Sequence, residues 1–210
     1  YCKELSDVKM DKADKITSIS LQGTKVSSID LSNKPLITNL NLGENPHLKS
    51  IDVTMLPLLE ELWINANGIK SLDVSKNPKL NHLECSRNKL TELDVTNNTK
   101  LESFFCWGNQ IKDEAMDKLI ASLVQESGDT EREFCVYNKL YADEGNVLTE
   151  EQAAAVKARG WIPKQATGSM EFFMWEEYEG VPTGIENLTI QKEDKGAWYD
   201  LNGRRIEKPS

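Results

Sequence analysis

Short triplets with an apolar residue on each side of a variable one recur along the first half of the chain, at intervals of ten or eleven residues. A segment this short cannot bury one face by itself, but copies stacked on one another form a continuous apolar interior. The pattern therefore predicts a solenoid. The nine triplets are Ile19-Ser20-Leu21, Ile29-Asp30-Leu31, Leu40-Asn41-Leu42, Ile51-Asp52-Val53, Leu62-Trp63-Ile64, Leu72-Asp73-Val74, Leu83-Glu84-Cys85, Leu93-Asp94-Val95 and Phe104-Phe105-Cys106.

Alternate triplets belong to a longer unit of 21 or 22 residues. Copies beginning at Leu59, Leu80 and Leu101 share a pattern of leucine or another apolar residue at positions 1, 4, 6 and 11 and asparagine at position 9. This is the diagnostic segment of leucine-rich repeats. The sequence thus predicts an α/β leucine-rich-repeat solenoid, a right-handed β-α superhelix built mostly from short strands and turns, with a helical C-terminal cap and a small β tail.

Two polar files accompany the repeat. The asparagines fall where the strand turns inward, and a buried amide there can bond the backbone of neighbouring coils, so we expect an asparagine ladder. The aspartates of the second half-repeat precede serine or threonine in a tight turn, which favours bonds to backbone N–H groups, although a file of carboxylates about 5 Å apart could also attract Ca²⁺. The two files are Asn45, Asn67, Asn88 and Asn109, and Asp30, Asp52, Asp73 and Asp94.

Charge and composition exclude several classes of partner. A net charge of -9 argues against nucleic acid or anionic membranes, which require clustered lysine and arginine. The sequence has no apolar run long enough for a membrane helix, no glycine-rich phosphate loop and no metal-ligand spacing, so we expect no membrane insertion, no metal and no cofactor. Cys85 and Cys106 share one inward position of consecutive repeats, which favours small core side chains, with a disulfide between them as the alternative.

The pattern changes after the repeats. Apolar residues at helical spacing predict a helix over 113–124, and Phe134 to Asn138 predicts a strand with Phe134 and Val136 inward. Thr149 fits the N-cap of a second helix ending at Gly160, and a strand through 161–162 with a hairpin at 172–175 would close the core. These features divide the chain into an N-terminal cap or leader remnant (1–15), the repeats (16–125), a C-terminal repeat and capping region (126–180), and a linker with a β-hairpin tail (181–210).

Short units that alternate Leu-x-Cys-x-x-Asn with Leu-Asp-Val-Ser resemble the surface leucine-rich-repeat proteins of Bacteroides-type gut bacteria, strongly over residues 16–125. The tail from Tyr199 to Arg205 is similar to C-terminal modules of secreted Bacteroidetes proteins, some of which act as sorting signals, but it stops at Ser210, before the Lys-Gly-x-Tyr strand that normally follows. The resemblance implies an extracellular or cell-surface protein associated with the outer membrane.

Residues between the inward positions of the main strand should point out from the concave face of the solenoid. Two files follow: Asn41, Trp63, Glu84, Phe105 and Cys135, then Gly43, Asn65, Ser86, Trp107 and Tyr137. We expect the concave-face ligand site to consist of Trp63, Asn65, Glu84, Arg87, Phe105, Trp107 and Tyr137. The alternative is that the segment after Gly160 folds over Phe105 and Trp107 as a cap.

Catalysis is a poor fit to this pattern. His82, Glu61 and Ser103 could sketch a triad, but on a shallow open face they could neither exclude water nor place an oxyanion donor. The sequence therefore predicts no catalytic residues and a monomeric recognition protein. Its ligand would be a protein of bacterial or host origin, with a glycan stacked on the same rings, or a spacer role without any ligand, as alternatives.

Overall fold

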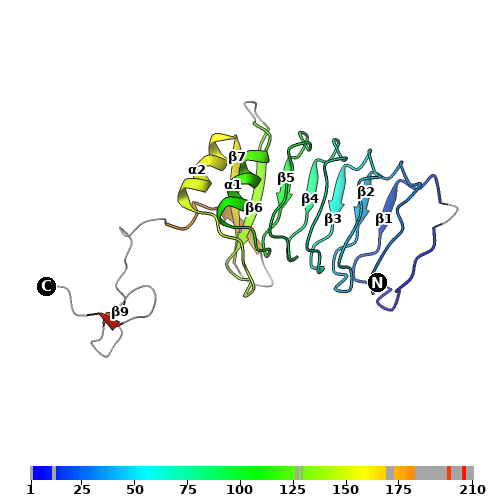
Figure 1. The fold of residues 1–210 in the computed structure, drawn as a ribbon, viewed down its shortest axis with the longest axis horizontal. Coiled ribbons are helices and arrows are strands. Elements are labelled where there is room, and N and C mark those ends of the chain that lie inside the picture. Colours follow the sequence, from blue (N-terminus) through cyan, green and yellow to red (C-terminus); the bar gives the residue numbers. More distant parts are fainter. Residues whose placement is uncertain are drawn as a thin grey trace.

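A computed structural model describes residues 2–10, 13–125, 128, 130–168 and 173–182, together with the backbone of 198–199 and 205–206. The chain forms a row of stacked coils from the N-terminal end to two helices at the other end (Figure 1). Each coil adds one strand to a sheet of eight in the order β1 to β8. The strands are β1 Ser18–Ser20, β2 Asn39–Asn41, β3 Glu61–Trp63, β4 His82–Glu84, β5 Ser103–Phe105, β6 Arg132–Asn138, β7 Trp161–Gly168 and β8 Phe173–Glu177.

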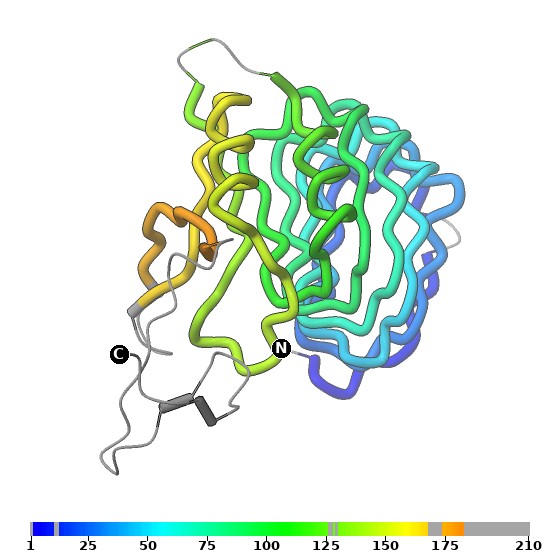
Figure 2. The backbone as a smooth tube through the Cα atoms, turned by 60° about the vertical axis from the view of Figure 1, so that its left-hand side comes forward, coloured from blue at the N-terminus to red at the C-terminus, as the bar shows by residue number. Residues whose placement is uncertain are grey.

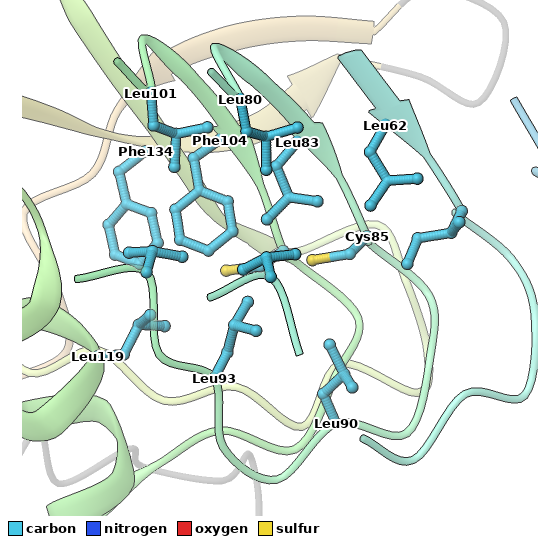
Figure 3. Close-up of a cluster of buried hydrophobic side chains, with 14 of the residues drawn as sticks. Leu62, Leu80, Leu83, Cys85, Leu90, Leu93, Leu101, Phe104, Leu119 and Phe134 are labelled. Atoms are coloured by element: carbon cyan, nitrogen blue, oxygen red, sulfur yellow. The ribbon is translucent and has the colours of Figure 1, made fainter. Parts of the chain in front are cut away.

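Neighbouring strands from β1 to β7 are parallel, as expected when every coil repeats the same path, and β8 returns antiparallel to β7. The register places Leu62, Leu83 and Phe104 opposite one another. All three side chains are fully buried, and Figure 3 shows them side by side in one row along the interior. The predicted leucine-rich-repeat solenoid with one shared core is confirmed.

The asparagine ladder is confirmed and extends further than predicted. Asn88 Nδ2 donates to the carbonyls of Ile64 and Cys85 at 2.8 and 3.0 Å, so one amide joins two successive coils. Asn146, outside the regular repeat, continues the ladder with bonds to the carbonyls of Cys106 and Val136. The smoothly stacked coils that these bonds connect are visible in Figure 2.

A second, shorter ladder lies on the other side of the coils. Asn77 Nδ2 donates to the carbonyls of Val53 and Leu56, and Asn98 Nδ2 donates to those of Val74 and Asn77. Both asparagines follow the Leu-Asp-Val triplet by three residues, where the preceding repeat carries Leu56. Only these two repeats carry the asparagine, which is too few copies for the spacing alone to predict a second ladder.

The aspartates of the second half-repeat form turn bonds, as predicted. Asp52, Asp73 and Asp94 each accept the backbone N–H two residues ahead, at 2.8 to 2.9 Å. Asp30 does the same with the N–H of Ser32. The hydroxyl of the same serine or threonine also bonds each carboxylate, and this bond, followed by the backbone one, stabilises the ionised form and lowers the pKa of all four groups.

Cys85 and Cys106 are fully buried free thiols in the apolar interior, in agreement with the core interpretation. Burial raises the pKa of both groups, which keeps them protonated. Cys85 points into the cluster of leucines and phenylalanines in Figure 3.

The last coils widen to include helices α1 Asp113–Ser122 and α2 Glu150–Ala158. Met116 and Leu119 of α1 and Val156 of α2 are buried in the shared core. Thr149 caps α2 in a complete capping box with Gln152, as its sequence predicts. None of the described helices is long and apolar enough to cross a membrane.

The first described residues of the expected linker pack against the start of α2. Val181 exchanges backbone bonds with Leu148 and Glu150, at 2.8 and 3.0 Å, so it is held at the start of α2. Gly180, at φ +84, passes against the backbone of Thr149, where a Cβ would clash. The expected strand over 185–190 lies outside the described residues, whereas β9 Trp198–Tyr199 and β10 Arg205–Ile206 pair antiparallel on either side of the predicted Asn-Gly turn.

Candidate functional site

The concave face of the sheet presents two outward residues from each three-residue strand. The register aligns Trp63, Glu84 and Phe105 in one file on β3, β4 and β5. A second file, on the other side of the buried leucines, aligns Glu61, His82 and Ser103. All six side chains are partly exposed, whereas the residue between them on each strand is buried. The predicted outward display of Trp63, Glu84 and Phe105 is therefore present in the structure.

Four rings form a continuous row across this face. The His82 ring lies between Trp63 and Phe105, with ring centroids 4.8 and 5.6 Å apart. Trp175, from the antiparallel strand β8, meets Phe105 edge-on at 5.5 Å and is itself 36% exposed. The ring row, Trp63, His82, Phe105 and Trp175, thus combines three repeat positions with one residue of the C-terminal hairpin.

Glu84 lies in the same file, between the two aromatic residues of β3 and β5. Its carboxylate accepts the backbone N–H of Ser86 at 2.9 Å and also the Ser86 hydroxyl. Burial raises the pKa of Glu84 to about 7, and the two bonds from Ser86 only partly offset this effect. No lysine or arginine forms an ion pair with Glu84 within the described part of the chain. The ring row is therefore accompanied by a carboxyl group that titrates near neutral pH.

Trp107 and Arg87 lie together at one rim of the face. Tyr141, in the loop after β6, meets the Trp107 ring edge-on at 5.6 Å, and the Arg87 guanidinium lies 5.4 Å from the centre of the Tyr141 ring. Arg87 is exposed, whereas the Trp107 Nε1 is buried without a hydrogen-bond partner among the described residues. Trp107 therefore belongs to a rim cluster around Tyr141 and is not a member of the ring row.

The remaining two expected site residues have different surroundings. Asn65 is half-buried, and its side chain lies directly against Gly43 of the preceding coil, where any Cβ would clash. Tyr137 was expected to continue the file of Trp107, but its ring stacks on Tyr178 at 4.9 Å with only 7° between the planes. A register shift between Cys135 and Tyr137 accounts for this placement, because it interrupts the regular alternation of β6.

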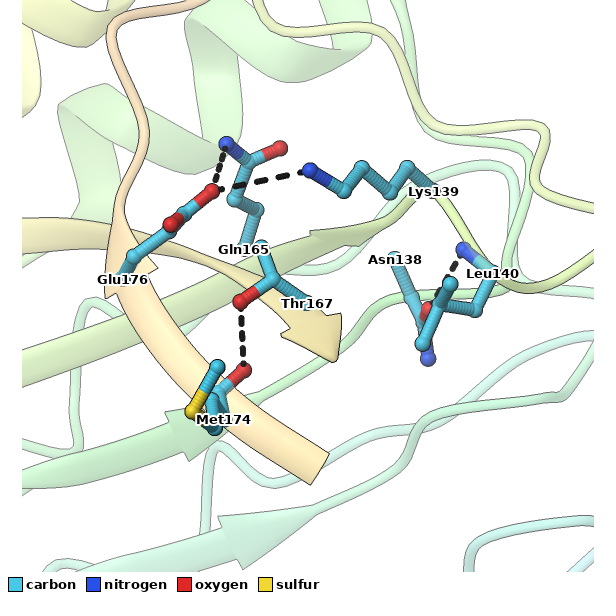
Figure 4. A network of polar contacts seen from close by, with 7 residues as sticks. All are labelled: Asn138, Lys139, Leu140, Gln165, Thr167, Met174 and Glu176. Carbon is cyan, nitrogen blue, oxygen red and sulfur yellow. Dashed lines mark hydrogen bonds and ion pairs between the residues drawn. The ribbon is translucent and has the colours of Figure 1, made fainter. Parts of the chain in front are cut away.

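The sequence left two interpretations of Phe105 and Trp107, an exposed ligand site or residues covered by a cap after Gly160. The structure combines the two. Part of the segment after Gly160 does cover Phe105, through Trp175, whereas Trp107 is covered from a different loop by Tyr141. Both rings keep partial exposure. The hairpin that brings Trp175 to the face is fixed by a bond from the Thr167 hydroxyl to the Met174 carbonyl and by Glu176, which accepts from Gln165 and pairs with Lys139 (Figure 4).

Glu61, His82 and Ser103 are neighbours but make no catalytic relay. Glu61 accepts a bond from the Asn39 amide, and His82 Nε2 is buried without a partner among the described residues. Burial lowers the pKa of His82. Over the same part of the chain, no group of three or more histidine, cysteine, aspartate or glutamate side chains is placed to hold a metal ion. His82 contributes its ring to the face from the position just before the buried Leu83. The expected ligand site contained only positions that follow the buried residue of each strand, so it did not include His82.

Comparison with known proteins supports the fold. The chain matches no family model and no curated protein. Among solved structures it is similar to the functional domain of InlJ from Listeria monocytogenes, described as including a cysteine ladder, with 21% identity and a TM-score of 0.53 over 95% of this chain and 44% of that one. It is also similar to an internalin, InlF, from Listeria monocytogenes, with 21% identity and a TM-score of 0.57 over 76% of this chain and 44% of that one.

The chain thus spans under half the length of each of these neighbours. Their identity to it is low, so the likeness concerns the path of the backbone and not the residues of the concave face. Together with the aligned leucines, the asparagine ladders and the parallel sheet, it establishes the architecture as a leucine-rich-repeat solenoid.

Proposed function

We propose that this chain is a non-catalytic recognition module that binds another protein through its concave strand face. The observation that carries the proposal is the ring row, in which His82 contacts both Trp63 and Phe105, so that rings from three successive strands adjoin. Aromatic side chains on a rigid sheet offer large contact areas at little conformational cost, and tryptophan is enriched among residues that dominate binding energy. Such a row would supply the centre of an interface.

Charge at the site also favours a specific partner. Glu61 and Glu84 stand beside the rings without a lysine or arginine ion pair in the described part of the chain, and Arg87 lies at the rim. Charged groups around an apolar centre steer association and exclude wrong partners more than they raise affinity. The solenoid neighbours and the resemblance to bacterial surface repeat proteins support an extracellular or cell-surface setting as part of this proposal.

The test is a binding screen of the whole chain against arrays of extracellular proteins and of glycans, repeated with two variants. Trp63→Ala removes one ring of the row, and Met55→Ala removes an apolar side chain that is 59% exposed on the turns away from the sheet. We expect a protein ligand whose affinity falls about 30-fold with Trp63→Ala, the effect of losing a residue worth about 2 kcal/mol, and stays unchanged with Met55→Ala.

Other outcomes would reject the proposal in distinct ways. Saccharides retained by the chain and lost with Trp63→Ala would establish the glycan alternative. A protein ligand that binds both variants equally would place the interface elsewhere. Absence of any ligand in either array would favour a structural spacer.

A further inference from the structure

A groove of about 650 Å³ lies on the side of the solenoid away from the concave face, between the turns of two narrow coils and helix α1. It exists because the coil that follows Ile111 widens to admit α1, which stands beside the narrower coils before it. Its volume falls in the range of about 300 to 1,000 Å³ that is typical of ligand sites. Its lining includes Leu72, Asp73, Glu92 and Asp94 from the coils and Ala115 and Lys118 from α1.

The apolar part of this groove is held in place. Leu72 and Ala115 are partly buried, packed against the core and still open to the groove. Ser122 links helix to coil, since its hydroxyl accepts the Val95 N–H at 3.2 Å and donates to the Leu119 carbonyl at 2.7 Å. The wall and the floor are therefore connected by hydrogen bonds as well as by the core, and a ligand would meet a preformed surface.

The rim of the groove is acidic. Asp73 and Asp94 occupy the same position of successive coils, and each uses Oδ1 to accept the amide N–H of Ser75 or Thr96. Each carboxylate also accepts a bond from the side-chain hydroxyl of the same Ser75 or Thr96. Those turn bonds lower the pKa of both carboxyls, so both are ionised at neutral pH.

Glu92 adds a third negative charge, and the lysine of the groove does not balance the set. Lys118 is paired with Glu114, one turn earlier on α1, at 2.9 Å. No ion pair involves Asp73, Glu92 or Asp94 within the described ranges. The groove consequently presents an apolar floor under a rim of three carboxylates that form no ion pair within the described ranges, although Lys76 and Lys118 lie near Asp73 and Glu92.

We propose that this groove binds a segment of a partner protein that places an arginine between Asp73 and Asp94 and an aliphatic side chain against Leu72 and Ala115. Equivalent positions on stacked coils are about 5 Å apart, and an ionised carboxylate has about four acceptor sites, more than its turn bonds occupy. The planar guanidinium carries donors on two edges that can reach both carboxylates. The arginine would supply the missing positive charge, and its aliphatic neighbour would cover the floor. This site is separate from the concave face and does not depend on the function proposed for that face.

The experiment is an NMR titration of the isotope-labelled chain with the peptide acetyl-Leu-Arg-Leu-amide at millimolar concentration. The matched probe replaces arginine by citrulline, which keeps the shape and removes the charge. We expect the arginine peptide to shift the amide signals of Ser75, Thr96 and Ala115, and the citrulline peptide to leave them in place.

Two variants and a control locate the effect. The double variant Asp73→Asn and Asp94→Asn keeps an acceptor for each turn amide and removes both charges, so affinity should fall at least about tenfold. Asp52→Asn makes the same change in an equivalent turn outside the groove, and should leave the affinity unchanged. Ala121→Trp, at an exposed position of the groove, should block the peptide without disturbing the core.

Several results would overturn the proposal. These are an absence of shifts with the arginine peptide, equal shifts with citrulline, or an equal loss of affinity in Asp52→Asn and the double variant. Trp63→Ala, which removes a ring from the concave face, should not alter the peptide titration. Failure of the groove proposal and failure of the concave-face proposal are therefore distinguishable.

Discussion

The narrow coils of residues 16–111 and the wide coils of residues 112–182 reach the same shared core by different means. In the narrow coils, three-residue strands alternate with turns, and buried asparagines join the carbonyls of successive coils. In the wide coils, strands of seven and eight residues alternate with two helices. Asn146 carries the ladder across the boundary, so the two regions share one hydrogen-bonded frame.

This difference explains which side-chain neighbours on the surface can be predicted from the repeat. In a narrow coil, each outward position returns one coil later, so the neighbours of Trp63 and Phe105 follow from the register. The wide coils contain helices, a register shift and an antiparallel hairpin. These features bring Tyr141, Tyr178 and Trp175 into ring contacts that the repeat period does not predict. The candidate site lies where the regular and irregular regions meet.

The largest effect should come from the rings that join the two regions in the core. Phe104, on the last narrow strand, and Phe134, on the first wide strand, are fully buried with centroids 5.2 Å apart. Phe104→Ala should lower the free energy of unfolding by about 3 to 5 kcal/mol, through lost burial and the resulting cavity. Denaturant unfolding of Phe104→Ala, Phe134→Ala and the double variant should show losses of unfolding free energy that are less than additive, because the two rings contact each other. Strict additivity with two separate transitions would mean that the regions are independent.

A somewhat smaller loss is expected from the ladder that the regions share. Asn88→Ala would leave the N–H of Ile69 buried without its partner. It would also remove one of the two amide bonds that the carbonyls of Ile64 and Cys85 each accept, the other coming from Asn67 and Asn109 respectively. At about 1 to 3 kcal/mol for the unsatisfied N–H and about 1 kcal/mol for each lost bond, with partial relaxation, we expect a total loss of about 2 to 4 kcal/mol. Asn65→Ala, at a half-buried outward position of the same repeat, serves as the control and should change stability by under about 0.5 kcal/mol. Equal losses in the two variants would contradict the ladder's role.

Glu84, on the concave face of the narrow coils, should make a pH-dependent contribution of intermediate size to the free energy of unfolding. Because the folded-state pKa of Glu84 is about 7, above its ordinary value of 4.5, the folded chain holds this proton more tightly than the unfolded chain. The stability that this tighter proton binding contributes is fully present below pH 4.5, the ordinary pKa, and is lost as the pH rises through the folded-state pKa of about 7. Glu84→Gln should therefore be more stable than the parent at about pH 8, by about 1 to 3 kcal/mol.

The measurement is the difference in unfolding free energy between Glu84→Gln and the parent at several pH values from about 5 to 8. His82 shifts in the opposite sense, with a lowered pKa, but it is present in both proteins and largely cancels in the difference. A difference that stays constant across this range would show that Glu84 is ionised throughout.

The smallest effect is expected at the start of the second helix in the wide coils. Thr149→Ala removes the hydroxyl that accepts the Gln152 N–H at 3.1 Å and breaks the capping box. The loss should be about 1 kcal/mol, and Thr149→Ser should restore most of it. A loss as large as that of Asn88→Ala would indicate that the wide coils depend on their caps as strongly as the narrow coils depend on their ladder.

Sequence alone predicted the coil stacking, the asparagine ladder, the turn aspartates and the capped helix, because each depends on local spacing repeated in register. It also placed Trp63, Glu84 and Phe105 on the concave face. It could not place Tyr137, since a register shift after Cys135 redirects that ring toward Tyr178. Nor could it place Trp175 against Phe105, because this contact depends on how the hairpin returns over the sheet.

The most direct test of concave-face recognition is hydrogen–deuterium exchange of the chain with and without the protein ligand found in the binding screen. Slower exchange on binding is predicted at the amides of 61–65, 82–86 and 103–107, which carry the three repeat residues of the ring row and their flanking positions. Unchanged exchange in all three segments, with protection elsewhere on the solenoid, would contradict the account.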